Sequence, residues 1–255
     1  MAVLCSRRAP GLLHLLNGDG ERGRAYEIVC CMTSETTFAE EVGVERRGVP
    51  TVSHPIRDFY LARGASVYRD AALRAEFDAR TLELLRPYSP DLLLLDGYLY
   101  LLTDPMLSAF PSRILNLHFS DLTLRLPDGR PRFPGIRSVR DALAAGCAET
   151  RATVHLVNEE ADAGPPLVRS WPLPVSPMAA EACASHAVDL FKAYAFAQQQ
   201  WMFRAIAGPL WAAALRLVSA GSVDLEALAS RVPHTVVPWD LDRRGVIHAA
   251  HSNAA

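Results

Sequence analysis

The sequence predicts an α/β protein with a Rossmann-like, mostly parallel sheet flanked by helices and a helical extension at its C-terminal end. Short apolar runs alternate with helical patterns over the first two-thirds of the chain, which is typical of βαβ units. The apolar run Leu92–Leu95 is unbroken, as expected for a strand covered on both faces. After Pro177 the composition shifts to Ala, Gln and aromatic residues. We therefore expect an α/β domain over residues 1–177 and a helical extension over residues 178–255, packed on that domain.

Each expected strand is a short apolar run that ends at a polar or turn-forming residue. In chain order the expected strands are Ala2–Cys5, Tyr26–Cys31, Thr51–Ser53, Leu92–Leu95, Arg113–Phe119 and Thr153–Val157. Alternate residues of a strand point to opposite faces. Leu115 and Leu117 therefore face one way, and Asn116 and His118 face the other.

The expected helices show apolar residues near helical spacing, or end at glycine or proline. They are Leu12–Leu16, Phe38–Arg47, Ala71–Leu85, a short helix capped by Thr103 and ending near Phe110, Ser138–Ala145, Met178–Ala207 and Pro209–Ala220. In the last two, Trp201, Phe203, Trp211 and Leu215 are expected to be packing residues. The last 25 residues contain Pro233 and Pro238 and are expected to be irregular.

Composition limits the function classes. The 255 residues are 50% hydrophobic and 21% charged, with a formal net charge of -2, so nothing favours nucleic acid or an anionic membrane as a partner. The five cysteines form no C-x-x-C pair and no zinc-ligand spacing. We expect reduced thiols, no metal and a cytoplasmic protein, either monomer or homodimer. The N-terminal residues read as a strand and turn rather than a signal peptide.

An ordered set of motifs connects the two central strands. The chain reads PDLLLLDGY, then ILNLH, FPGIRSVRDAL and ATVHLVNEEADAGPPL. This series resembles the folate-dependent formyltransferases, most closely those that act on glycinamide ribonucleotide. The matching positions are Asn116, His118, Pro134-Gly135, His155 and Asp162-Ala163-Gly164-Pro165. The resemblance implies a catalytic domain that transfers a formyl group from 10-formyltetrahydrofolate to a primary amine.

The resemblance assigns roles to these residues. Asn116 and His118 would donate hydrogen bonds to the oxygen that gains charge, and Asp162 would raise the pKa of His118 and orient water. Folate would lie against residues 98–102 and 158–165, with its pterin bonded mainly to main chain. The expected folate-binding residues are Tyr98, Leu99, Leu101, Leu102, Glu160, Ala161 and Asp162.

The loop after the first strand departs from the family. The family has a glycine-rich loop there, whose amides hold the substrate phosphate, whereas this chain has Ser6-Arg7-Arg8-Ala9-Pro10-Gly11. Proline removes an N–H donor. Arg7, Arg8 and Gly11 are therefore the residues that we expect to bind the substrate. The acidic residue that the family uses late in the chain to meet the amine also has no counterpart within residues 200–209.

Alternatives stay open at this point. The acceptor is glycinamide ribonucleotide in purine biosynthesis, or another amine such as an amino sugar nucleotide or an amino-acid derivative. A non-catalytic folate-binding protein is a third possibility, although the Asn-His-Asp set argues against it. A metal triad of His118, His155 and Asp162 lacks a zinc spacing motif, and His155 reads as a structural histidine. In the long loop Ser120–Phe133, three arginines face either an anionic substrate or, as we favour, solvent.

Overall fold

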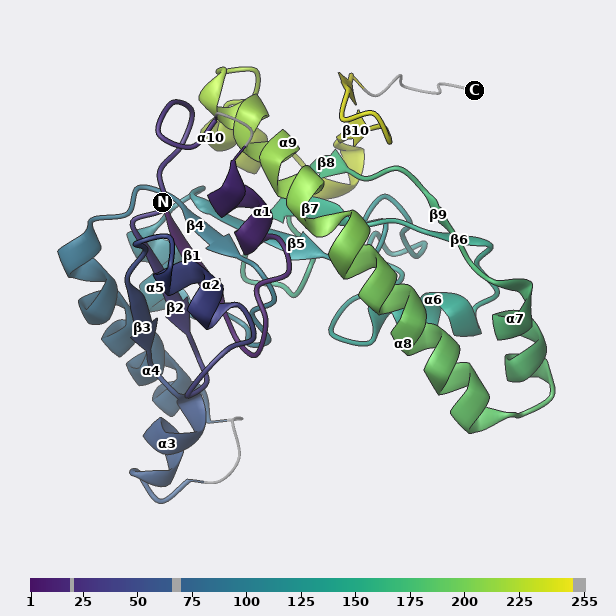
Figure 1. Ribbon diagram of the computed structural model, residues 1–255, viewed down its shortest axis with the longest axis horizontal. Coiled ribbons are helices and arrows are strands. Elements are labelled where there is room, and N and C mark those ends of the chain that lie inside the picture. Colours follow the sequence, from purple (N-terminus) through teal and green to yellow (C-terminus); the bar gives the residue numbers. More distant parts are fainter. Residues whose placement is uncertain (19–20, 66–69, 250–255) are drawn as a thin grey trace. The chain divides into compact units, whose positions relative to one another are not determined.

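The computed structural model describes residues 1–18, 21–65 and 70–249. Contacts divide the chain into two compact units, Met1–Asn116 and Leu117–Ala255 (Figure 1). The expected boundary after residue 177 is untested and stays a prediction. The HSNAA end lies outside the described residues.

The first unit is built on a parallel sheet with the strand order β3-β2-β1-β4-β5. The strands are β1 (Ala2–Cys5), β2 (Cys30–Thr33), β3 (Thr51–Ser53), β4 (Leu93–Leu95) and β5 (Ile114–His118). All residues of β1, β2 and β4 are buried, as their uninterrupted apolar or small side chains predict. Because the strands are parallel, the loops that follow β1 and β4 meet at one edge of this sheet.

The helices of the first unit are α1 (Leu12–Asn17), α2 (Glu41–Glu45), α3 (Ile56–Leu61), α4 (Ala71–Leu85), the 3-10 turn η1 (Arg86–Tyr88) and α5 (Asp104–Ala109). The bounds of α4 match the sequence expectation, and Asp70 caps it by accepting hydrogen bonds from the N–H groups of Ala72 and Leu73. Thr103 precedes α5 but does not cap it with its side chain. Its hydroxyl donates to Asp78 instead.

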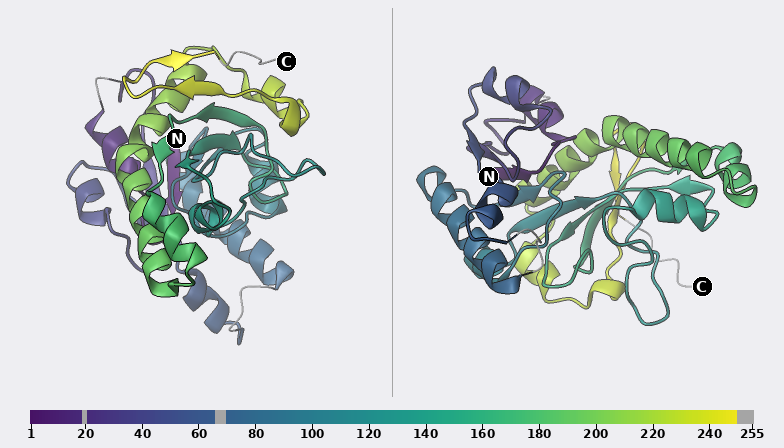
Figure 2. Two further views of the ribbon diagram at one scale, coloured as in Figure 1. Left: turned by 90° about the vertical axis from the view of Figure 1, so that its right-hand side faces the viewer. Right: turned by 90° about the horizontal axis from the view of Figure 1, so that it is seen from below.

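The second unit contains a mixed set of strands. In it β7 (Thr153–Leu156) pairs antiparallel with β8 (Pro166–Arg169), which pairs parallel with β10 (Trp239–Leu241). The antiparallel strand β11 (Ile247–His248) follows; Figure 2 shows β10 and β11 in yellow. A separate pair joins β6 (Glu149–Thr150) to β9 (Leu173–Pro174). The expectation of an irregular C-terminal segment is therefore wrong for β10 and β11.

Helices α6 (Ser138–Ala144), α7 (Pro177–Ala184), α8 (Val188–Ala205), α9 (Ala207–Ser219) and α10 (Leu225–Ala229), with the 3-10 turn η2 (Pro233–Thr235), complete the second unit. The expected single helix Met178–Ala207 is interrupted, because His186 takes a positive φ of 56°. The N–H of Ala187 donates back to the carbonyl of Ala182, which ends α7.

The four residues of the C-terminal helices that were expected to pack differ in burial. Trp211 and Leu215 are buried on α9, whereas Trp201 on α8 is 45% exposed. Phe203 is half-buried and its ring lies 4.5 Å from that of Phe119. Across the described residues, no helix combines the length and apolar character that crossing a membrane requires. All five cysteines are free thiols, and Cys5, Cys30 and Cys31 are buried.

Candidate active site

His118 ends β5 and is held at both ring nitrogens. Its Nε2 lies 2.9 Å from the carbonyl oxygen of Phe133, and its Nδ1 lies 3.3 Å from Oδ1 of Asp162. A carbonyl oxygen can only accept, so Nε2 carries a proton. Asn116 is two residues earlier on the same strand and therefore on the same face as His118, as expected, while Leu115 and Leu117 are buried on the other.

Asp162 is the centre of this arrangement. Its Oδ2 accepts a 2.7 Å hydrogen bond from the N–H of Gly135, and its Oδ1 lies 3.7 Å from Nε2 of His155. Its own backbone has a positive φ of 56°, which few residues besides Gly, Asn and Asp adopt readily. A residue other than glycine that takes this conformation and carries three polar contacts is typical of a functional site.

The neighbouring Gly164 is required by close backbone packing. A Cβ built at this position would lie 1.9 Å from the carbonyl oxygen of Leu156, a contact that no real Cβ makes. The loop that carries Asp162 therefore folds back tightly on β7. The D-x-G-P motif thus has a local physical reason: its glycine permits the approach that brings the carboxylate of Asp162 to His118.

Burial and charge act against each other on the pKa of His118. Burial of the ring is the largest effect and lowers the pKa, while the Asp162 carboxylate and the Phe133 carbonyl raise it, and the net pKa is lowered. Asp162 raises the pKa of His118, as expected, but desolvation of the ring outweighs the carboxylate, so the net pKa is lowered. Both ring nitrogens nevertheless face acceptors, so the site is already arranged to receive a proton on His118.

Asp162 stays ionised. Burial alone would raise its pKa, but the nearby rings of His155 and His118 and the N–H of Gly135 together hold the pKa well below its usual range. His155 is buried on β7, with Nδ1 2.7 Å from the carbonyl oxygen of Leu156. This bond is consistent with a structural histidine that positions Asp162. Within the described part of the chain, no group of three or more His, Cys, Asp or Glu residues is placed to hold a metal ion.

In the first unit, carboxylates already hold the amides of the loop after β1. The N–H of Ala9 donates to Oε2 of Glu40 at 2.7 Å, and the N–H of Gly11 donates to Oδ2 of Asp96 at 2.8 Å. Pro10 has no N–H. A phosphate could therefore reach the Gly11 amide only by displacing Asp96. Sequence reasoning missed both acids, which lie 31 and 85 residues from their partners.

The arginines of this loop remain exposed. The side chain of Arg7 is 80% exposed and lies 3.6 Å from Glu35, and Arg8 is also exposed. The loop is fixed against the segment after β4, because a Cβ at Gly97 would lie 2.4 Å from the carbonyl oxygen of Arg8. Gly97 also has a positive φ of 78°. The turn D-G in the LLLLDGY motif therefore supplies a carboxylate at Asp96 and the close approach at Gly97.

A buried ion pair on α4 holds residues 98–103 in place. Arg74 lies 2.9 Å from Asp78 and donates to the Tyr98 hydroxyl and to the Leu101 carbonyl, both at 3.0 Å. Asp78 accepts from both the N–H and the hydroxyl of Thr103. The segment nevertheless presents apolar side chains to its surface, with Leu99 46% and Leu101 61% exposed, whereas Leu102 is buried.

The expected folate residues thus fall in two segments, one in each unit. In the second unit, Glu160 and Ala161 are exposed beside the half-buried Asp162. Of the seven expected folate-binding residues, Leu102 is buried and the others are partly or fully exposed.

Comparisons with known proteins agree with this geometry. The model of the formyl transferase family matches residues 1–206. Phosphoribosylglycinamide formyltransferase of Escherichia coli is 30% identical over 171 residues, which cover 61% of this chain and 69% of that protein. The chain is also 37% identical over 153 residues to formyltetrahydrofolate deformylase of Bacillus subtilis, covering 60% of this chain and 44% of that protein.

Larger proteins and a solved structure extend the likeness. The human trifunctional purine biosynthetic protein adenosine-3 is 27% identical over 227 residues, which cover 88% of this chain but 19% of that protein. The chain therefore spans less than a fifth of the trifunctional relatives it matches. The crystal structure of glycinamide ribonucleotide transformylase 1 from Symbiobacterium toebii matches with a TM-score of 0.63 and 28% identity, covering 91% and 92% of the two chains.

Because the family model covers most of the sequence, this chain belongs to the formyl transferase family. The expected fold class, a mostly parallel sheet flanked by helices, is confirmed with it.

Proposed function

We propose that the protein transfers a formyl group from 10-formyltetrahydrofolate to a primary amine, with glycinamide ribonucleotide as the acceptor. The observation that carries this proposal is the arrangement of Asp162 between the Gly135 N–H and His118, at the end of a strand that also bears Asn116. Bound folate would supply the activated formyl group, and residues 98–102 would contribute to holding it. A cytoplasmic location follows from the proposed pathway.

The residues act on charge and protons rather than through a covalent bond to the protein. As the amine adds to the formyl carbon, the formyl oxygen gains negative charge. The Asn116 amide would stabilise this charge by donating a hydrogen bond, and a protonated His118 would stabilise it by its positive charge, since its two N–H groups donate to Phe133 and Asp162. Asp162 accepts from Nδ1 of the imidazolium and keeps the ring in place. The lowered pKa of His118 makes it ready to give up the proton again at neutral pH. The amine loses one proton and the departing folate nitrogen gains one, so protons balance.

The phosphate of the acceptor would be bound by side chains rather than by the main-chain amides of a glycine-rich loop. The amides of Ala9 and Gly11 already donate to carboxylates. We therefore assign the phosphate to the exposed guanidinium groups of Arg7 and Arg8, which can form charge-assisted hydrogen bonds to it. The same observation favours a second candidate function, formyl transfer to an amine that carries no phosphate at this loop.

The test measures folate binding and acceptor use separately. Calorimetry with a 10-formyl folate analogue should show saturable binding, and adding glycinamide ribonucleotide should produce formylated amine. Folate binding without turnover of glycinamide ribonucleotide would reject the proposed acceptor and favour another amine. Absence of folate binding would reject the proposed function altogether.

A further inference from the structure

The second unit contains a cavity of about 320 Å³ that the proposed reaction does not use. The residues from Ser120 to Phe133, the long loop that follows β5, contribute part of its wall. Apolar walls come from Phe119, Leu124, Phe133 and Ala142. The polar and charged residues of the lining are Ser120, Asp121, Arg132, Glu149, Thr150 and Arg151. This volume is at the lower end of the range for small-molecule sites.

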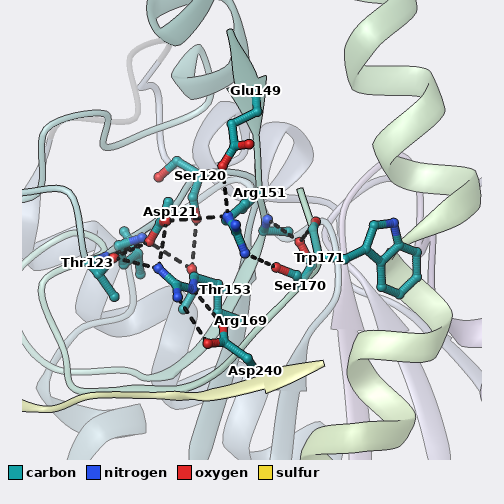
Figure 3. A network of polar contacts seen from close by, with 12 residues as sticks. Ser120, Asp121, Thr123, Glu149, Arg151, Thr153, Arg169, Ser170, Trp171 and Asp240 are labelled. Atoms are coloured by element: carbon teal, nitrogen blue, oxygen red, sulfur yellow. Dashed lines mark hydrogen bonds and ion pairs between the residues drawn. The ribbon is translucent and has the colours of Figure 1, made fainter. Parts of the chain in front are cut away.

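Ser120 supplies a buried hydroxyl without a partner. The residue is 4% exposed, and its Oγ forms no hydrogen bond within the described structure, although its carbonyl accepts from Thr153. Its neighbours are densely bonded, as Figure 3 shows: Arg169 lies 3.0 Å from Asp121, and Arg151 donates to the Ser170 carbonyl. A buried hydroxyl left out of such a network costs free energy unless a ligand bonds to it.

Arg132 supplies a cation that no described carboxylate neutralises. Its guanidinium carbon lies 5.1 Å from the ring centroid of Phe133, and no ion pair is formed by its side chain among the described residues. Both acids that line the cavity are already paired, Asp121 with Arg169 and Glu149 with Arg151 at 3.2 Å. Arg132 is therefore the charged side chain of the cavity lining that forms no ion pair among the described residues.

We propose that this cavity binds a small aromatic carboxylate. The ring would lie among Phe119, Leu124 and Phe133, and the carboxylate would accept hydrogen bonds from Arg132 and from the Ser120 hydroxyl. The cavity also adjoins the catalytic pair, because Phe133 lines it and accepts the hydrogen bond from His118. Occupancy is therefore expected to change kcat; this last consequence rests on the proposed function, whereas binding does not.

Benzoate is the probe, and calorimetry should show saturable binding to the full chain. Arg132→Gln should weaken binding at least tenfold, because it removes the charge-assisted bond. Arg130→Gln is the matched control, since Arg130 is in the same loop but is paired with Asp128 at 2.7 Å. Benzamide, which is the neutral isostere, should bind more weakly than benzoate. Equal binding of both compounds, or equal effects of the two arginine variants, would overturn the proposal.

A second pair of variants tests the hydroxyl. Ser120→Ala should leave Tm unchanged or raise it, because the hydroxyl has no partner, and should weaken benzoate binding. Ser138→Ala should lower Tm, because that buried hydroxyl donates to the Phe119 carbonyl at 3.2 Å. A fall in Tm for Ser120→Ala as large as that for Ser138→Ala would contradict the assignment of Ser120.

The thiols locate the bound probe. Cys147 lines the cavity and is half-buried, and Cys183 on α7 is half-buried but does not line it. Saturating benzoate should slow alkylation of Cys147 by N-ethylmaleimide and leave Cys183 unaffected. Equal protection of both thiols, or protection of neither, would show that benzoate does not occupy this cavity. With binding established, an unchanged kcat would reject the coupling to His118.

Discussion

Asp162→Asn tests the catalytic pair with little disturbance of the backbone. Asn adopts a positive φ almost as readily as Asp, so the conformation at 56° is retained, whereas Ala would add backbone strain. The amide oxygen of Asn can also still accept the bond from the Gly135 N–H. What is lost is the negative charge that lies 3.3 Å from His118.

The magnitude follows from that lost charge. Without the carboxylate, only the Phe133 carbonyl opposes the effect of burial on His118, so the pKa of His118 falls further and its protonated form becomes scarce. Loss of one such donor costs about 100- to 1000-fold in kcat, or about 3 to 4 kcal/mol of transition-state stabilisation. Steady-state kinetics should show this fall mainly in kcat, with folate affinity from calorimetry reduced by less than about tenfold.

Glu181→Gln provides the control, because this exposed acid on α7 belongs to the same unit and forms no ion pair within the described structure. It should change kcat by less than about threefold. The account of the pair would be refuted if Asp162→Asn, with an unchanged circular dichroism spectrum, kept kcat within about threefold of the wild type.

Three further predictions concern other parts of the chain. Burial and nearby arginines lower the pKa of His54 to about 4, so the unfolded chain binds a proton at this histidine before the folded chain does. The free energy of unfolding therefore falls by about 3 kcal/mol as the pH drops from about 6.5 to about 4. His54→Phe should remove this part of the pH dependence in urea titrations, and the same dependence of unfolding free energy on pH in both proteins would contradict the prediction. Gly164→Ala should destabilise the protein by several kcal/mol or prevent folding, because its Cβ would meet the Leu156 carbonyl, and a Tm within about 2 °C of the wild type would be inconsistent with that contact. Arg7→Ala should raise KM for glycinamide ribonucleotide about 10- to 150-fold with little change in kcat, and an unchanged KM would exclude Arg7 from phosphate binding.

Local sequence signals predicted much of the fold. The bounds of α4 follow from its Asp cap and helical spacing, and β1 and β3 match their expected residues. The break between α7 and α8 was missed, because it depends on a positive φ at His186 in a stretch that otherwise favours helix. The strand β10 was missed because it is three residues long and exists through its pairing with β8.

The sequence predicted the residues of the candidate site but not the pKa of His118 or the partners of the loop amides. The motifs singled out His118, Asp162 and Gly164, and in the structure Nδ1 of His118 lies 3.3 Å from Oδ1 of Asp162. The direction of the pKa of His118 depends on how deeply the ring is buried, which no local pattern reports. The occupation of the Ala9 and Gly11 amides by distant acids is likewise a property of the folded chain.

The most direct test of the central claim follows the fate of the formyl group. 10-Formyltetrahydrofolate carrying an isotopic label in its formyl carbon would be incubated with the protein and glycinamide ribonucleotide, and the label would be traced by mass spectrometry. A formyl transferase that uses Asn116, His118 and Asp162 should place the label on the acceptor amine, and His118→Ala should abolish that product. Label released solely as formate, at the same rate with and without the amine, would contradict the account.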